Sequence, residues 1–340
     1  MGEVLPRYLG RDYTLNDACA PSSIGRFCKM LSQLQAHDRI YSESDYEWIP
    51  QDCPICGPKP KQFLGYRGGS AHRMNLGVRC SVWRCTVCNL IFPNPMPVPR
   101  NGLGQHYDVP PEHYFYGHKQ LAATRYADTL IEEAEQLLNV KGRLLDVGSG
   151  RGELARAAKS RGWQVVAIEP SAAFARTLKQ DGIQVVETPI EECKLPDGAF
   201  DVVICAAVLE HLYNPDRTTE SISRLLRRGG ILFVDVPNEH GLYFLIGNLY
   251  ERLRRKNATV NLSPTFAPYH VFGFSPDSLK RLLRKHALQP IRWRVNRGKT
   301  GLPRRGGVVA VMESSAVEVV NLVSSVGQLG SFIETWAQKT

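Results

Sequence analysis

The feature that most constrains the fold is an apolar segment that runs into a glycine-rich turn, Gly142-Arg-Leu-Leu-Asp-Val-Gly-Ser-Gly-Arg-Gly152. Apolar residues then recur at helical spacing from Leu154, and a second apolar segment, 165–168, ends at Glu169. A strand, a glycine turn, a helix and a strand in this order predict a βαβ unit and a parallel sheet. The glycines let a ligand approach the backbone, and the helix behind them presents unpaired N–H groups to that ligand.

The acidic residues around this turn indicate the class of ligand. Glu169 stands where a carboxylate accepts hydrogen bonds from ribose hydroxyls, which predicts a ligand that contains adenosine. A dinucleotide fingerprint would read G-x-G-x-x-G, whereas this chain has Asp146-x-Gly148-x-Gly150-x-Gly152. A carboxylate two residues before the first glycine suits a cationic ligand with an ammonium group better than it suits a pyrophosphate.

From these residues onward the sequence resembles the class I S-adenosylmethionine-dependent methyltransferases. Residues 200–212 are similar to the fourth strand and following loop of that family, and residues 225–238 to its next helix, glycine turn and fifth strand. Residues 289–295 and 307–313 look like the sixth and seventh strands. The resemblance covers about residues 140–313. It implies an α/β fold with a Rossmann-like seven-stranded sheet, helices on both faces and S-adenosylmethionine as the cofactor.

The resemblance places the cofactor contacts at the ends of the first four strands. Residues after the first strand would line the methionine and ribose, and those after the second would hold the ribose hydroxyls and adenine. Residues after the third strand would cradle the adenine ring, and those ending the fourth would pass near the sulfonium. In chain order these residues are Asp146, Gly148 and Gly150; Glu169, Pro170 and Ser171; Ile190 and Glu191; and Cys205 and Ala206.

Two C-x-x-C motifs, Cys53-Pro-Ile-Cys56 and Cys85-Thr-Val-Cys88, precede this region. Each such turn presents two thiolates, and two turns complete the tetrahedral Cys₄ site of a structural zinc ion. A redox role is the alternative, but it needs one motif at the start of a helix. Cys80 lies close enough in the chain to replace one ligand. This order of elements resembles bacterial small-molecule methyltransferases, deoxysugar-modifying enzymes among them, that carry an N-terminal zinc subdomain.

Candidate bases follow from the chemistry of methyl transfer to oxygen or carbon, which requires removal of a proton. A general base contributes about 10²–10⁴-fold to such a step, and histidine is the natural choice near neutral pH. His211 follows the fourth strand, at the sheet edge where open α/β folds bind ligands. Tyr269 and His270 come just before a helix capped by Ser275. The sequence does not choose among these catalytic candidates.

The net charge of +9 is concentrated in one segment. Residues 251–305 alone carry a net charge of +12, so the rest of the chain is slightly acidic. This segment predicts an anionic partner, which we expect to be a small-molecule acceptor such as a sugar bearing phosphate or a nucleotide. The alternative is an RNA methyltransferase that grips RNA with the zinc ribbon and this segment. Residues 242–256 predict either a lid helix with a packed apolar face or a peripheral membrane anchor.

The chain organisation follows from these motifs. We expect an N-terminal extension over residues 1–50, a zinc-binding subdomain over 51–100 and a connecting helical segment over 101–139. The domain that binds S-adenosylmethionine would cover 140–313, with a lid insertion at 238–274, and apolar spacing predicts a C-terminal helix over 314–340. The chain shows neither an uninterrupted apolar run of membrane-spanning length nor a secretory leader, so we expect a cytoplasmic enzyme. The oligomeric state is left open.

Overall fold

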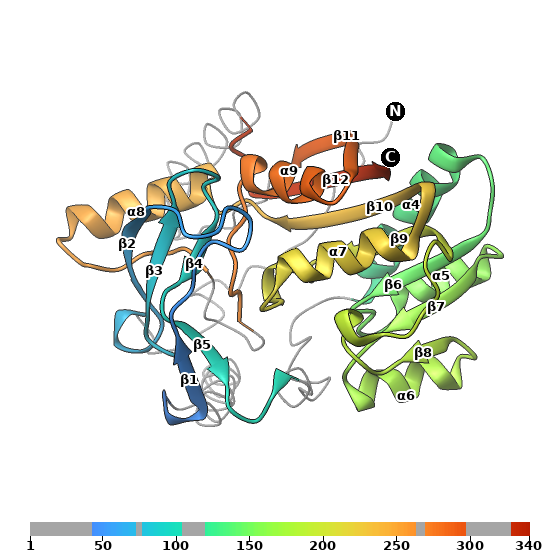
Figure 1. The fold of residues 1–340 in the computed structure, drawn as a ribbon, viewed down its shortest axis with the longest axis horizontal. Coiled ribbons are helices and arrows are strands. Elements are labelled where there is room, and N and C mark those ends of the chain that lie inside the picture. The colour runs from blue at the N-terminus through green and yellow to red at the C-terminus, as the bar shows by residue number, and fades with distance from the viewer. Residues whose placement is uncertain (1–42, 73–76, 104–119, 263–268, 297–327) are drawn as a thin grey trace, which may run out of the picture.

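The structure is a computed structural model that describes residues 43–72, 77–103, 120–262, 269–296 and 328–340. Most of the expected N-terminal extension and the expected strand at 307–313 therefore lie outside the described residues. Two regions face each other in Figure 1. One is the cysteine module, residues 43–99, and the other is a large sheet with its helices, here called the sheet domain.

The sheet domain is built on seven strands in the order β11-β12-β10-β9-β6-β7-β8. The five strands from β10 to β8 in this order run parallel, whereas β12 is antiparallel to both β10 and β11. This is the expected Rossmann-like seven-stranded sheet. The strands are β6 (Arg143–Val147), β7 (Gln164–Ile168), β8 (Gln184–Val186), β9 (Phe200–Ala206), β10 (Leu226–Pro237), β11 (Leu288–Asn296) and β12 (Phe332–Lys339).

Helices cover both faces of this sheet because successive strand residues point to opposite sides. In β9, Val202 and Ile204 join the core under α4 and α5, whereas Val203 and Cys205 join the core under α7 and α9. Asn214 and Ser275 cap α7 and α9, each with a proline at the start of the helix. The covering helices are α4 (Gln120–Leu138), α5 (Glu153–Ser160), α6 (Ala172–Gln180), α7 (Pro215–Leu225) and α9 (Pro276–Lys285).

The predicted C-terminal helix is wrong for residues 332–339, which form strand β12 between β10 and β11. Apolar positions there fit helical spacing, but Ile333 and Ala337 face one core and Trp336 faces the other, as a strand buried on both sides requires. Trp336 packs on Phe233 of β10, with ring centroids 5.0 Å apart. Pairing with a strand about a hundred residues away in the chain overrides the local pattern.

The cysteine module holds two small sheets. β2 (Lys61–Arg67), β3 (Cys80–Cys85) and β4 (Ile91–Pro93) form a three-stranded antiparallel sheet, and β1 (Tyr46–Ile49) pairs with β5 (Met96–Pro99). The second cysteine pair lies at the turn between β3 and β4, at the end of a hairpin. The short 3₁₀ helices η2 (Glu43–Asp45) and η3 (Gly69–Ala71) complete the module.

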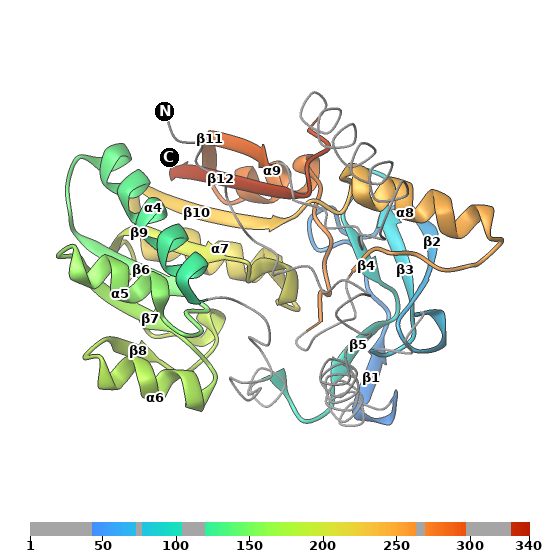
Figure 2. The same ribbon diagram turned by 180° about the vertical axis from the view of Figure 1, so that it is seen from behind.

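The insertion at 238–274 joins the cysteine module to the sheet domain. Its residues Ala258 and Gly273 form β-bridges with Tyr66 and Ile91 of the module. Helix α8 (Leu242–Leu253) lies beside β2 and β3 in both ribbon views (Figures 1 and 2). The expected packed apolar face of this helix is not found among the described residues, because α8 has no buried residue. Six of its eight apolar side chains are exposed, whereas Leu242 and Phe244 are half-buried.

Candidate functional site

The glycine turn after β6 has the conformation that its sequence demands. Gly148, Gly150 and Gly152 all have positive φ, a region that side chains with a Cβ rarely adopt. A Cβ on Gly148 would also lie 2.5 Å from Cγ2 of Val208, in the segment after β9. The glycines therefore serve packing as well as ligand access, and they bring the turn against the loop that carries His211.

Glu169, at the end of β7, fixes the shape of this turn. Its Oε2 accepts a hydrogen bond of 2.7 Å from the Gly150 amide, and its Oε1 accepts one of 2.8 Å from the Ser171 amide. The buried carboxylate thus links two loops at the sheet edge. A carboxylate oxygen can accept more than one hydrogen bond, and the contact with ribose hydroxyls stays a prediction.

Asp146 is a buried carboxyl group beside the glycine turn. It is 2% exposed, and its Oδ2 has no hydrogen-bond partner among the described residues. Burial, and then the nearby charge of Glu169, raise the pKa of Asp146 to about 7. An unsatisfied buried carboxylate is costly, and a ligand that brings a positive charge or a donor would relieve that cost. The environment matches the expected cationic ligand.

The remaining residues expected to contact the cofactor lie at the same edge with different surroundings. Ile190 is buried in the short helix η4 (Ile190–Glu192), and Glu191 accepts a hydrogen bond from the Thr218 hydroxyl of α7. Cys205 is fully buried, and burial raises its pKa well above the ordinary thiol value, so the thiol is inert at neutral pH. Pro170 and Ala206 are half-buried, whereas Ser171 is buried. Contact of these residues with a cofactor stays a prediction.

Two of the predicted catalytic histidines meet in space. His211 ends the short helix η5 (Leu209–His211), and its ring centroid lies 4.8 Å from that of His270 in an edge-to-face arrangement. The backbone brings them together, because the Glu210 carbonyl accepts hydrogen bonds from the Val271 and Phe272 amides at 2.8 and 3.1 Å. Tyr269, the third candidate, is buried next to His270 in the chain.

Each histidine has a buried carboxyl group beside it. Glu210 Oε1 lies 3.9 Å from Nε2 of His211, and Glu239 Oε1 lies 3.9 Å from Nδ1 of His270. Burial raises the pKa of Glu210 to about 7, although the charge of His270 opposes this shift. The other oxygen of Glu239 accepts hydrogen bonds from the Asn261 side chain and the Leu262 amide, at 2.8 and 3.0 Å. These bonds fix its carboxylate against the histidine pair.

The arrangement of Glu210, His211 and His270 permits two kinds of chemistry. Two imidazoles flanked by carboxylates can accept and relay a proton. The same three side chains also offer potential ligand atoms that all lie within 4.8 Å of one another, which is compatible with a divalent cation. The two functions exclude each other, because a metal-bound imidazole nitrogen cannot take a proton.

Two acidic residues of this region were not predicted from the sequence. The sequence signal for Glu239 is its position alone, two residues after the fifth strand of the sheet domain. Asp235 of β10 lies opposite Ala206 of β9 in the sheet register. Its carboxylate accepts hydrogen bonds from the Ala207 amide at 2.5 Å and from the Tyr126 hydroxyl at 2.9 Å. Burial raises the pKa of Asp235 to about 6. No local motif marks it, because its partner Tyr126 is remote in the chain.

The four cysteines of the two C-x-x-C motifs form one cluster. Their sulfurs all lie within 4.8 Å of one another, and Cys53 and Cys88 are 3.5 Å apart. A tetrahedral zinc ion with bonds of about 2.3 Å places its sulfurs about 3.8 Å apart, so the donor set fits zinc. The hydrogen bond from Cys88 lowers the pKa of Cys53 to about 6. Cys80 lies outside the cluster, with its sulfur 3.0 Å from Nε of Arg67.

Comparison with known protein families decides the identity of the sheet domain. Residues 116–292, more than half of the chain, match a family model described as a methyltransferase domain. The chain belongs to this methyltransferase family. The glycine turn, the histidine pair and the flanking carboxylates all lie within the matched segment of the methyltransferase.

Individual relatives match over shorter stretches. A ubiquinone biosynthesis O-methyltransferase of Sodalis glossinidius is 27% identical over 40% of this chain and 58% of its own length. A probable S-adenosylmethionine-dependent methyltransferase of Mycobacterium tuberculosis is 33% identical over 28% of this chain and 35% of its own. The matches thus span about half the length of these relatives or less. A solved S-adenosylmethionine-dependent methyltransferase of Archaeoglobus fulgidus aligns over 67% of this chain and 97% of its own, with a TM-score of 0.45 and 18% identity.

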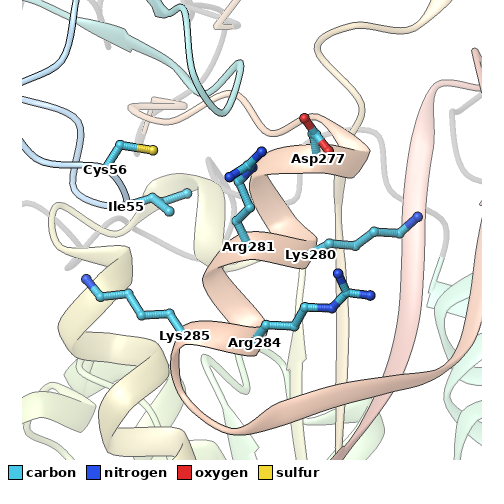
Figure 3. Close-up of a pocket in the computed structure, with 7 residues that line it drawn as sticks. All are labelled: Ile55, Cys56, Asp277, Lys280, Arg281, Arg284 and Lys285. Atoms are coloured by element: carbon cyan, nitrogen blue, oxygen red, sulfur yellow. The ribbon is translucent and has the colours of Figure 1, made fainter.

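A basic pocket of about 500 Å³ separates the methyltransferase helix α9 from the first cysteine turn. Figure 3 shows Arg281 and Lys285 on the side of α9 where Ile55 and Cys56 lie, and Lys280 and Arg284 extending to its other side; Asp277 also lines the pocket. Arg281, Arg284 and Lys285 are all exposed, and Lys285 also forms an ion pair with Asp216 at 2.8 Å. Among the described residues, the basic segment predicted from sequence is divided between the end of α8, helix α9 and strand β11.

Proposed function

We propose that this protein transfers the methyl group of S-adenosylmethionine to a small-molecule acceptor, on oxygen or carbon. Three features support the proposal: the family match, the glycine turn with its fixed shape, and the buried carboxyl of Asp146. The Asp146 environment favours a ligand with an ammonium group over a pyrophosphate. A nucleotide-binding domain without catalysis is the rival reading, and the histidine pair argues against it.

The observation that carries the proposal is the contact between His211 and His270 beside two buried carboxyl groups. Bound S-adenosylmethionine supplies an electrophilic methyl group. One imidazole of the pair would accept the proton of the acceptor, and the second would share the positive charge that results. Glu210 and Glu239 would stabilise that charge and hold the rings in place. Positioning of the acceptor supplies much of the remaining acceleration.

We propose that the four clustered cysteines hold a structural zinc ion. All four tetrahedral positions would be filled by thiolates, which leaves no position open for a substrate. Cys53, Cys85 and Cys88 belong to the same buried core as Phe272 and Phe274, which follow His270 closely in the chain. The zinc ion would therefore support the wall of the active site from outside.

The acceptor that we propose is anionic, such as a sugar that carries phosphate or a nucleotide. The pocket at α9 supports this class because guanidinium groups match the geometry of phosphate oxygens. RNA is the second candidate, favoured by the same pocket together with the basic end of α8. The two candidates differ in the salt dependence of binding, which would be steep for RNA.

The test is to incubate the purified full-length protein with methyl-labelled S-adenosylmethionine and a cell extract, then to separate small molecules, lipids, protein and RNA. Label in the small-molecule or lipid fraction that survives nuclease supports the proposal. Label that nuclease releases from RNA overturns the choice of acceptor. Calorimetry with S-adenosylhomocysteine gives an independent readout, and failure to bind this product would overturn the proposed activity altogether.

A further inference from the structure

Helix α8 exposes a set of large apolar side chains that a water-facing helix would not carry. Six of its residues are 46% to 75% exposed: Tyr243, Leu245, Ile246, Leu249, Tyr250 and Leu253. Scattered exposed apolar residues need no explanation, but a contiguous patch on one element marks a contact surface. The exposed residues make up half of this helix of 12 residues.

The helix cannot turn these exposed side chains inward, because its opposite face contacts a later part of the same insertion, at Val260 and Asn261. A Cβ on Gly247 would lie 2.7 Å from Cγ2 of Val260, so only glycine allows this close approach. Asn248 donates a hydrogen bond to Oδ1 of Asn261 at 2.7 Å and accepts one from the Val260 amide at 3.0 Å. Gly247 and Asn248 therefore face the protein together with the half-buried Phe244, and the six exposed apolar residues face away from it.

The pattern of charge around this face is that of a helix lying in a membrane interface. At 3.6 residues per turn the six apolar side chains occupy an arc of about 160°, with Arg252 and Arg254 at its two borders. Arg254 also lies over the ring of Tyr250, 5.4 Å from its centroid. Arg255 and Lys256 follow, exposed, and Glu251 is the helix's one acidic residue. Basic residues that border an apolar face with tyrosines match anionic headgroups above acyl chains.

We propose that α8 docks this protein on the surface of an anionic membrane. Among the described residues, no helix has the length and apolar character to span a bilayer. At about 1.5 Å per residue, α8 would lie in the interface and not cross the hydrocarbon core of about 30 Å. A second copy of the chain is the less favoured occupant, because a symmetric pairing through this face would bring the basic residues at the borders of the two copies together. This docking does not depend on which reaction the site performs.

The test is flotation of the full-length protein with vesicles of phosphatidylcholine alone and of phosphatidylcholine mixed with phosphatidylglycerol. We expect binding to the mixed vesicles that weakens as salt is added. Leu249→Glu should lower the partition coefficient at least about tenfold, since burial of one leucine accounts for that much. Replacement of Arg252 and Arg254 by Gln together should lower it about thirtyfold on mixed vesicles and hardly change it on phosphatidylcholine.

The matched controls are Val140→Glu and Arg228→Gln, at exposed positions of the methyltransferase domain away from α8. Both should bind vesicles like the unaltered protein, and circular dichroism checks the fold of every variant. Undiminished flotation of Leu249→Glu would overturn the proposal, as would absence of binding to mixed vesicles. A concentration-dependent dimer in sedimentation velocity, dissociated by Leu249→Glu, would assign the face to a second copy and also overturn it.

Discussion

The cysteine cluster and the histidine cluster are both groups of reactive side chains that are buried or half-buried in this protein, yet they are assembled in opposite ways. The cysteines come in two pairs, each contained in four residues, and only one long-range contact between turns completes the site. His211 and His270 are separated by almost sixty residues, and each depends on a carboxylate fixed by a different loop. A site made from local turns tolerates change elsewhere, whereas a site made from remote segments depends on the whole fold.

Loss of the cysteine site should have the largest effect. Structural zinc contributes about 10 kcal/mol or more to the fold that it holds, so Cys88→Ser or chelation should unfold the cysteine module and lower the melting temperature of the whole chain. The two regions share one core, which carries the effect into the methyltransferase domain. Zinc content by mass spectrometry and thermal unfolding by circular dichroism check this expectation.

The matched control is Cys80→Ser, because Cys80 is buried in the same module but lies outside the cluster. It should keep one zinc ion per chain. Loss of zinc from this variant, with full retention in Cys88→Ser, would show that Cys80 is a ligand in place of Cys88.

Substitution of the histidine pair should have the second-largest effect. His211→Asn and His270→Asn should each lower kcat by about 10²–10⁴-fold while binding of S-adenosylhomocysteine stays within a factor of a few, because the base acts on the acceptor. The double variant should be little worse than the worse single one if the rings act as a unit. Calorimetry and turnover with the labelled acceptor separate the two quantities.

A chelation assay on the unaltered protein distinguishes proton transfer from metal binding at the histidine pair. A weak chelator that leaves the cysteine-bound zinc in place should not change kcat. Loss of activity on chelation and recovery with added Mn²⁺ or Mg²⁺ would contradict the role of the histidines as bases.

Asp146→Asn should weaken cofactor binding by about 10–100-fold, as expected for a lost hydrogen bond to a charged group. The pKa of Asp146 is raised to about 7, so the unliganded folded state holds this proton more tightly than the unfolded chain does. Its contribution to stability is therefore full below the ordinary pKa and is lost as pH rises from about 4 through 7. Affinity for a cationic cofactor should rise over the same range and level off above 7.

The amide variant should consequently be more stable than the unaltered protein at pH 8, by up to about 4 kcal/mol, while it binds the cofactor less well. Urea unfolding and calorimetry at pH 6 and 8 measure the two opposite changes. Equal stability of both proteins at the two pH values would show that Asp146 is ionised throughout.

The smallest expected effect is that of Glu239→Gln, a positioning residue. The amide keeps the hydrogen bond from Leu262 but removes the negative charge beside His270. We expect kcat to fall about tenfold with KM unchanged, because the positive charge that forms on the histidine pair loses a neighbouring carboxylate. Glu187→Gln, at an exposed ion pair with Lys179, is the control and should leave kcat and KM unaltered. A rise in KM together with the fall in kcat would indicate a purely structural role.

Much of this protein is determined by its sequence alone, because the signals are local. The glycines after β6 need backbone conformations that other residues resist, and the spacing of Cys53, Cys56, Cys85 and Cys88 suffices for a tetrahedral site. The parallel strands read as short apolar runs, since both of their faces are buried. The signal for each of these features lies within one turn or one strand, although a long-range contact joins the two cysteine turns.

The tertiary structure decided the rest, because there the energetics depend on partners that the local chain does not contain. Residues 332–339 form a strand since β10 and β11 offer a gap between them. Glu239 joins the site through hydrogen bonds from residues that lie beyond α8. The same helix turns its apolar face outward because Gly247 and Asn248 fit the insertion better than any leucine would. Periodicity shows that a helix has two faces, and only packing decides which of them is buried.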